Sequence, residues 1–317
     1  MLHITNGESV VGTFRQVRFP GKYLSWIDVL HDGPVPQTAT LSELSDIRAQ
    51  ALADFGAGAY GSVRAGFAAR DQALENFRKH EEVVLWFEHD LFDQLQLIQL
   101  LDWFSEQEPG KTRISLAQIN SYPGVNPFYG LGQLSGTQLA RLFPKRVTVT
   151  SAHLESAAQA WHAFRASDPT NLLELSRQKS AALPFLSAAL ERFLEEYPWT
   201  NDGLSRTERQ ILQAVAAGKR GKTEIYTASS KQEETPWGDA SVYLRMEWLA
   251  SGPQPALVKP DRDEYALTDA GQRLLEAKAD WIALQGGIDR WLGGVHLTGK
   301  QSQWRWDGDK KTLIGHS

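Results

Sequence analysis

The chain has 317 residues, of which 42% are hydrophobic and 22% charged, and it contains no cysteine. This composition excludes a disordered chain, and the lack of cysteine excludes disulfides, thiolate metal sites and a cysteine nucleophile. The net charge is −5; residues 1–199 carry 17 basic and 22 acidic side chains, and residues 200–317 carry 16 of each. Because neither part is basic, we do not expect a strong non-specific attraction to nucleic acid.

The length predicts two domains, or one domain with a substantial appendage. No run of roughly 18 apolar residues is present, and the sequence opens with strand-like Leu2–Thr5 instead of a basic region followed by an apolar segment. We therefore expect a cytoplasmic protein that makes no membrane contact.

Short apolar runs alternate with helical patterns over the first 150 residues. The expected strands are Leu2–Thr5, Tyr23–Trp26, Val83–Phe87 and Arg113–Ile119. Helical patterns separate them over Ser9–Val17, over residues 41–80 and from Leu91 onward. The alternation predicts an α/β, Rossmann-like domain at 1–150 with a mostly parallel sheet and helices.

Helices dominate after residue 134. Ser135 and Gln138 form a capping-box pattern, and Val147–Thr150 is a candidate for a last short strand. Two helical patterns, over residues 152–165 and 184–196, predict a helical connector at 151–199. Turn-forming residues at 197–203 mark the boundary to a last domain at 200–317.

The last domain opens with a second capping-box pattern, Ser205 to Glu208. Helical patterns follow over residues 206–217, 223–226 and 239–250. Strand-like residues 256–258 and 265–267 then flank a polar turn at Asp261–Asp263, and another helix begins near Thr268. This order is that of a winged helix, and the aromatic C-terminal tail, in which Trp304 and Trp306 alternate at strand period, is expected to pack on one of the domains.

The first candidate site is the turn after the first strand. Asn6, Gly7 and Ser9 precede or begin a helix, whose free backbone N–H groups can hold a phosphate or carboxylate. Simple helix capping by Asn6 or Ser9 is the alternative, since the turn lacks the glycine spacing of a dinucleotide-binding loop.

Two His-Asp dipeptides follow the second and third strands. The first lies in a segment with Asp28, His31 and Asp32; the second lies in a segment with Glu88, His89, Asp90 and Asp93. In an open α/β sheet such residues meet at the carboxyl ends of the strands. His89, Glu88, His31 and Asp28 are therefore candidate catalytic residues for general acid–base chemistry, and a His/carboxylate metal set is equally open.

Helix capping offers a competing explanation for part of this pattern. Asp90 stands where an N-cap residue is expected, and Asp93 favours the same helix terminus electrostatically. Asp32, Asp93 and Asn120 are kept as candidate ligand contacts, whereas the Gly130-Leu131-Gly132 segment is interpreted as a structural loop that can line the same cleft.

The third helix of the last domain would be the recognition helix if DNA were a partner. Its residues 238–250 include Asp239 and Glu247 but only one cation, Arg245. Direct readout and phosphate contacts need more Arg, Lys or Asn. Packing or protein contacts are the preferred role, and DNA binding is possible but not supported by charge.

Three motifs are similar to those of a known family. Residues 3–9, 26–34 and 85–94, together with 203–212 and 290–297, resemble a bacterial family catalogued as domain of unknown function 1835 and its companion C-terminal region. The resemblance covers nearly the whole chain and implies a soluble bacterial protein, but it supplies no catalytic residue. Glu8 stands where the family's opening motif has Asp, which argues against a strict catalytic role there.

The favoured function is an enzyme or ligand-binding protein for a small polar molecule, with phosphorylated and nucleotide-like molecules as candidates. Two alternatives stay open: a ligand-sensing, DNA-binding regulator and a non-catalytic protein-interaction module. The sequence specifies no cofactor, metal or oligomeric state. So many carboxylates near one cleft would repel an anion, and a divalent metal would relieve that repulsion.

Overall fold

The computed structural model describes residues 1–259 and 264–315 and divides the chain into two compact units. Unit 1 comprises Met1–Leu190 with Gly293–Val295, and unit 2 comprises Glu191–Leu292 with His296–Ser317. The turn expected at Asp261–Asp263 lies outside the described residues. No helix in the described ranges is both long and apolar enough to cross a membrane.

Unit 1 contains a five-stranded sheet with the strand order β2-β1-β4-β5-β6. Its strands are β1 (Leu2–Thr5), β2 (Lys22–Ser25), β4 (Glu82–Phe87), β5 (Arg113–Gln118) and β6 (Val147–Thr148). The first four are parallel, and β6 is antiparallel to β5. The expected α/β class with a mostly parallel sheet is therefore confirmed, and each of the four expected strands lies within one or two residues of its expected bounds.

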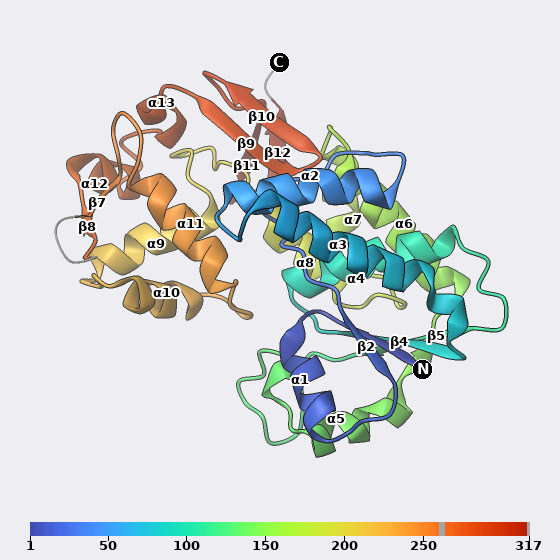
Figure 1. Ribbon diagram of the computed structural model, residues 1–317. Helices are drawn as coiled ribbons and strands as arrows, with labels where there is room; N and C mark the ends of the chain where they lie inside the picture. The colour runs from blue at the N-terminus through green and yellow to red at the C-terminus, as the bar shows by residue number, and fades with distance from the viewer. Residues whose placement is uncertain (260–263, 316–317) are drawn as a thin grey trace. The chain divides into compact units, whose positions relative to one another are not determined.

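Helices cover both faces of this sheet (Figure 1). Those of unit 1 are α1 (Glu8–Gln16), α2 (Leu41–Asp54), α3 (Tyr60–Glu75), α4 (Leu91–Ser105), α5 (Gly136–Leu142), α6 (Ser151–Arg165) and α7 (Thr170–Ser176). A two-residue strand, β3 (Gly33–Pro34), and short 3-10 turns, among them η2 (Leu131–Gln133), lie in the connections. The helices α1 and α5 lie on one face, and α2, α3 and α4 lie on the other.

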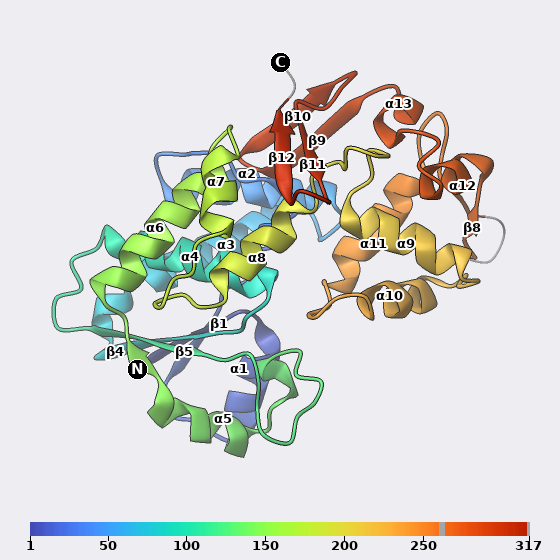
Figure 2. The ribbon, with the colours of Figure 1, turned by 180° about the vertical axis from the view of Figure 1, so that it is seen from behind.

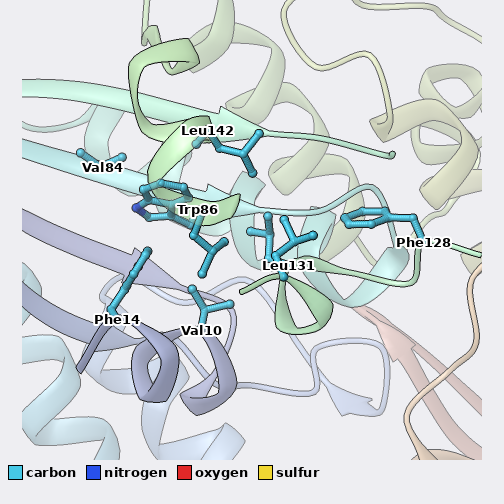
Figure 3. Packing of buried hydrophobic residues seen from close by; sticks show 10 residues of the cluster. Val10, Phe14, Val84, Trp86, Phe128, Leu131 and Leu142 are labelled. Carbon is cyan, nitrogen blue, oxygen red and sulfur yellow. The ribbon is translucent and has the colours of Figure 1, made fainter. Parts of the chain in front are cut away.

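The face under α1 and α5 is closed by a compact apolar core (Figure 3). Strand residues alternate between the two faces of a sheet, so Val84 and Trp86 point to the same side. There they pack with Val10 and Phe14 of α1, which are at most 1% exposed, and with residues of the 128–142 segment. This core fixes the start of α1 and the 128–134 loop over the end of β4.

Helix α4 on the opposite face is buried nearly all round. Its residues Leu95, Leu97, Ile98 and Leu101 are fully buried, as expected for a helix enclosed by other elements on several sides. α6 packs along it (Figure 2). Residues 151–190, which the sequence assigns to a connector, therefore belong to unit 1 in the structure, and the division falls at Leu190 instead of within 197–203.

Unit 2 begins with three helices, an antiparallel strand pair and a fourth helix. These are α9 (Arg206–Ala216), α10 (Lys222–Ser230), α11 (Asp239–Leu249), β7 (Leu257–Val258), β8 (Ala266–Leu267) and α12 (Asp269–Leu275). The expected capping box is present, with Ser205 Oγ accepting from the Glu208 N–H and the Glu208 carboxylate accepting from the Ser205 N–H.

The C-terminal segment of the chain, which belongs to unit 2 except for Gly293–Val295, is mostly β-structure. It contains α13 (Trp281–Gln285), β9 (Ile288–Gly293), β10 (Val295–Gly299), β11 (Trp304–Asp307) and β12 (Thr312–Gly315). The strands β11 and β12 are antiparallel. The strand period of Trp304 and Trp306 is therefore confirmed, but the sequence did not predict four strands in this tail.

A buried ion network joins the first helices of unit 2. It involves the end of α8 (Leu186–Leu194), which begins two residues after the Pro184 that was expected to open it. The Glu196 carboxylate, fully buried, accepts from Arg192 at 2.9 Å and from Arg245 of α11 at 3.1 Å. These two guanidinium groups hold the pKa of Glu196 well below its usual range despite its burial. The pairing with Glu196 therefore holds the Arg245 side chain in the interior of unit 2.

Candidate functional site

The loops after β1 and β4 leave neighbouring strands of the sheet at the same edge. β1 leads into α1 on one face, whereas β4 leads into α4 on the other. The connections therefore diverge between β1 and β4, which makes this position a topological switch point.

Three carboxylates gather at this position. One oxygen from each of Glu88, Asp90 and Asp93 can be chosen so that all three atoms lie within 4.8 Å of one another. Glu88 directly follows the last residue of β4, Asp90 is the N-cap of α4, and Asp93 lies in the first turn of α4. Glu88 is 4% exposed and Asp93 is fully buried.

Hydrogen bonds fix this carboxylate cluster in place. The Asp90 side chain accepts from the Asp93 N–H at 2.8 Å, which confirms the expected N-cap. Asp93 Oδ1 accepts from the Glu88 N–H at 2.7 Å, and its Oδ2 accepts from the side-chain amide of Asn6 at 2.7 Å. Asn6 thus ties the end of β1 to the start of α4, and it does not cap α1.

The loop at Gly130-Leu131-Gly132 closes over the cluster from the α1 side. The Leu131 N–H donates to Glu88 Oε1. A methyl group on Gly130 would overlap the Glu88 carboxylate, and one on Gly132 would lie 2.8 Å from Ser9 Oγ. A side chain at either position would displace the neighbouring group, because the backbone passes close to both. The sequence did not predict the hydrogen bond between the Leu131 N–H and Glu88. The Gly-x-Gly spacing at residues 130–132 was the only feature that pointed to this loop.

Burial perturbs the pKa of each member of the cluster. Loss of hydration raises the pKa of Glu88 to about 8, and the nearby Asp90 adds to this effect. Burial likewise raises the pKa of Asp90 to about 6, and it raises the pKa of Asp93 well above its usual range. Three acids this close to one another cannot all ionise unless a cation compensates them.

The start of α1 faces the same edge of the sheet. Its N-cap, Gly7, makes no side-chain cap hydrogen bond, so the first N–H groups of the helix have no intrahelical partner. Ser9 is exposed in the first turn. Glu8 is exposed as well and accepts hydrogen bonds from Ser25 and Arg15.

His31 and Asp32 lie together on the α4 side. Both are at most 4% exposed, and His31 Nε2 lies 3.7 Å from Asp32 Oδ2. The His31 ring packs edge-on against Phe92, the residue before Asp93, with the ring centroids 6.2 Å apart. The pair therefore borders the first turn of α4.

His89 points toward aromatic side chains. Its ring stacks on Phe128 at a centroid distance of 6.1 Å and meets Phe185 edge-on at 6.0 Å. The residue is adjacent to Glu88 in sequence, but successive residues of an extended chain point in opposite directions. His89 thus follows Glu88 directly in the sequence, and its ring packs against Phe128 and Phe185.

Asp28 is paired with another residue, and Asn120 lies at the surface. Asp28 is fully buried in an ion pair with Arg48, whose Nη2 lies 2.8 Å from Asp28 Oδ1. Arg48 also donates to the carbonyls of Asp32 and Val29, so Asp28 organises the loop after β2. Asn120 is exposed, and its side-chain oxygen accepts a 3.3 Å hydrogen bond from Ser121 Oγ.

In chemical terms the cluster offers hard oxygen ligands. Carboxylate and amide oxygens are the donors that Mg²⁺, Mn²⁺ and Ca²⁺ prefer. In the described part of the chain, Glu88, Asp90 and Asp93 are the group of three that could hold a metal ion. No protein-family model matches the chain, and no curated protein matches it.

Proposed function

We propose that unit 1 binds a small phosphorylated molecule together with a divalent cation at the carboxyl ends of β1 and β4. The observation that carries this proposal is the meeting of the Glu88, Asp90 and Asp93 carboxylates with the uncapped start of α1 at a topological switch point. Ligands of open α/β sheets bind at such points.

The two halves of the site have opposite electrostatic character. The start of α1, around Gly7 and Ser9, favours an anion because its N–H groups and helix dipole present positive charge. The carboxylates repel an anion but attract a divalent cation, and a cation between them and a phosphate satisfies both. This arrangement favours a Rossmann-like assignment for unit 1 and a phosphate ester as the ligand class.

His31 and His89 are the candidates for proton transfer. His31 lies beside Asp32 and against Phe92, and His89 is next to Glu88. A histidine near neutral pKa beside carboxylates suits general acid–base work on a bound ester. Under this proposal Asp28 has a structural role only, because Arg48 occupies its carboxylate.

A thermal-shift series on the full chain tests the proposal, using MnCl₂, inorganic phosphate and AMP as probes. We expect AMP to raise the melting temperature more in the presence of Mn²⁺, since a ligand that binds only the native state stabilises it. His31→Ala and His89→Ala should weaken the AMP effect, whereas His153→Ala on α6 should not. If both variants respond like the wild type, the histidines have no part in the site.

DNA binding is the weaker alternative. The helix order of α9, α10, α11, the β7–β8 hairpin and α12 supports a winged-helix assignment for unit 2, and an antiparallel bridge between Gly221 and Glu264 extends the hairpin. However, Arg245, the only cation of α11, is 3% exposed and paired with Glu196. A salt-sensitive shift of duplex DNA by the full chain would favour the regulator instead.

A further inference from the structure

Unit 2 contains a hollow of about 260 Å³ that the proposed function does not use. It lies between the end of α11, helix α13 and the start of β9. Its walls include Trp248 of α11, Trp281 and Ile282 of α13, and Arg290 of β9. The volume is slightly below the ~300–1,000 Å³ of ordinary ligand pockets, so the hollow suits a ligand of one or two rings.

Glycine backbone forms much of the remaining wall. Gly203, Gly252 and Gly287 all line the hollow and have φ values of 71°, 86° and 149°. A methyl group on Gly252 would overlap Gln285, and one on Gly287 would lie 2.7 Å from the Gly299 carbonyl oxygen. Glycine is favoured at these positions because of the positive φ values and because neighbouring protein atoms already fill the space of a side chain.

Arg290 supplies the positive charge of the hollow. Arg290 Nη2 donates a hydrogen bond to the buried Glu208 carboxylate. The guanidinium lies 5.3 Å from the centre of the Trp248 ring. Among the described residues, its Nε and Nη1 have no hydrogen-bond partner. A planar guanidinium held in this way can still present donors to a carboxylate.

Glu208 is the counter-ion of Arg290, and the second acid at the hollow, Asp289, does not pair with it. Asp289 also borders the hollow, but side chains at successive strand positions point to opposite faces. The Asp289 carboxylate accordingly pairs with His296, at 2.7 Å, and its side chain is 83% exposed. Of the two charged residues in the wall, Arg290 is therefore the one that lies beside Trp248.

We infer that this hollow binds a small aromatic carboxylate, whose ring packs against Trp248 and Trp281 while its carboxylate pairs with Arg290. The tryptophans supply flat apolar surface, and a partly desolvated guanidinium favours an anion over a neutral ring. The site is separate from the carboxylate cluster and does not depend on it.

Calorimetric titration of the full chain with indole-3-acetate tests this inference, with indole as the uncharged probe. We expect indole-3-acetate to bind at least about tenfold more tightly than indole, a ratio equivalent to 1.4 kcal/mol. Equal affinities for the two probes, or no binding of indole-3-acetate at millimolar concentration, would overturn the inference.

Two matched substitutions locate the binding site. Ser251 is exposed at the edge of the hollow, so Ser251→Phe should fill it and abolish binding. Ala283, exposed on α13 but not part of the wall, provides the control Ala283→Phe, which should bind normally. If Ser251→Phe unfolds, Ser251→Leu replaces it. Unchanged binding by a folded Ser251 variant would contradict the assignment.

Discussion

The side-chain amide of Asn6 donates a 2.7 Å hydrogen bond to Asp93 Oδ2, although 87 positions separate the two residues in the sequence. This bond connects the end of β1 with the first turn of α4 across the switch point. Because Asp93 Oδ1 also accepts from the Glu88 N–H, both oxygens of one buried carboxylate are used to hold the cluster together. Asn6 is therefore a positioning residue.

Replacing Asn6 by alanine should destabilise the protein by about 1.5–3 kcal/mol, because it removes a donor from a buried acidic group. The free energy of unfolding in urea measures this effect. Asn76→Ala is the control, since the Asn76 amide donates only to an exposed carbonyl, that of Gln72. A change of less than about 0.5 kcal/mol, typical of surface substitutions, would show that the Asn6 bond contributes nothing.

The metal-free protein should lose stability as the pH rises from 6.5 to 8. Burial raises the pKa of Glu88 to about 8 from an ordinary value of 4.5, so the native state keeps a proton that the unfolded chain has lost. Such a group lowers the free energy of unfolding with increasing pH, by up to about 1.4 kcal/mol per pH unit. Burial lowers the pKa of His3, which has the opposite effect but acts only below about 6.5.

Urea titrations in EDTA at several pH values measure this slope. Glu88→Gln should make it smaller because the variant has no carboxyl to titrate at that position. Mn²⁺ should stabilise the wild type more at pH 8 than at pH 6.5, since a cation favours the ionised carboxylates. A wild-type slope that Glu88→Gln leaves unchanged would assign the pH dependence to other groups.

Substituting Gly130 by alanine should displace Glu88. The new methyl group would overlap the carboxylate, which must then leave the Leu131 N–H. We expect Mn²⁺ affinity to fall by about tenfold or more, the equivalent of one charge-assisted hydrogen bond. Gly66→Ala is the matched control, because Gly66 lies in α3 with open space around it. Equal Mn²⁺ affinities of the two variants would show that Gly130 has no effect on the metal site.

Asp28→Asn should be strongly destabilising, by about 3–5 kcal/mol, because it leaves the guanidinium of Arg48 buried without its counter-charge. The double replacement Asp28→Leu with Arg48→Met should recover much of this loss, since no charge remains buried. Chemical denaturation of the three proteins measures the effect. A stable Asp28→Asn protein with reduced AMP binding would show that Asp28 belongs to the functional site.

Local patterns in the sequence predict most of unit 1. Residues 2–5 and 83–87 were predicted as strands because they are short runs that contain β-branched or aromatic residues, and Asp90 was predicted as an N-cap because it directly precedes the helical pattern. The same patterns placed Asn6 after the first strand and Glu88 after the third expected strand, but they did not predict that these two strands are neighbours. Asn6 and the residues after β4 lie together because β1 and β4 are parallel neighbours in the sheet. Hydrophobic periodicity predicts the individual strands but not their order.

Other features depend on long-range contacts that no local pattern encodes. Asp28 and Glu88 look alike as strand-exit carboxylates, but Arg48, twenty residues away on α2, neutralises only Asp28. Likewise, α6 resembles any amphipathic helix, and its position on α4 depends on which apolar faces fit. The tail strands β9–β12 were missed because their glycines and polar residues interrupt the apolar alternation.

Mn²⁺ binding measured by electron paramagnetic resonance tests the central claim most directly. The metal-free chain should bind a single Mn²⁺, and the affinity should fall by about tenfold or more in Asp93→Asn but not in Asp54→Asn, a change at an exposed acid of α2. Added AMP should alter the spectrum of the bound ion. Absence of a bound ion in the wild type, with or without AMP, would contradict the account.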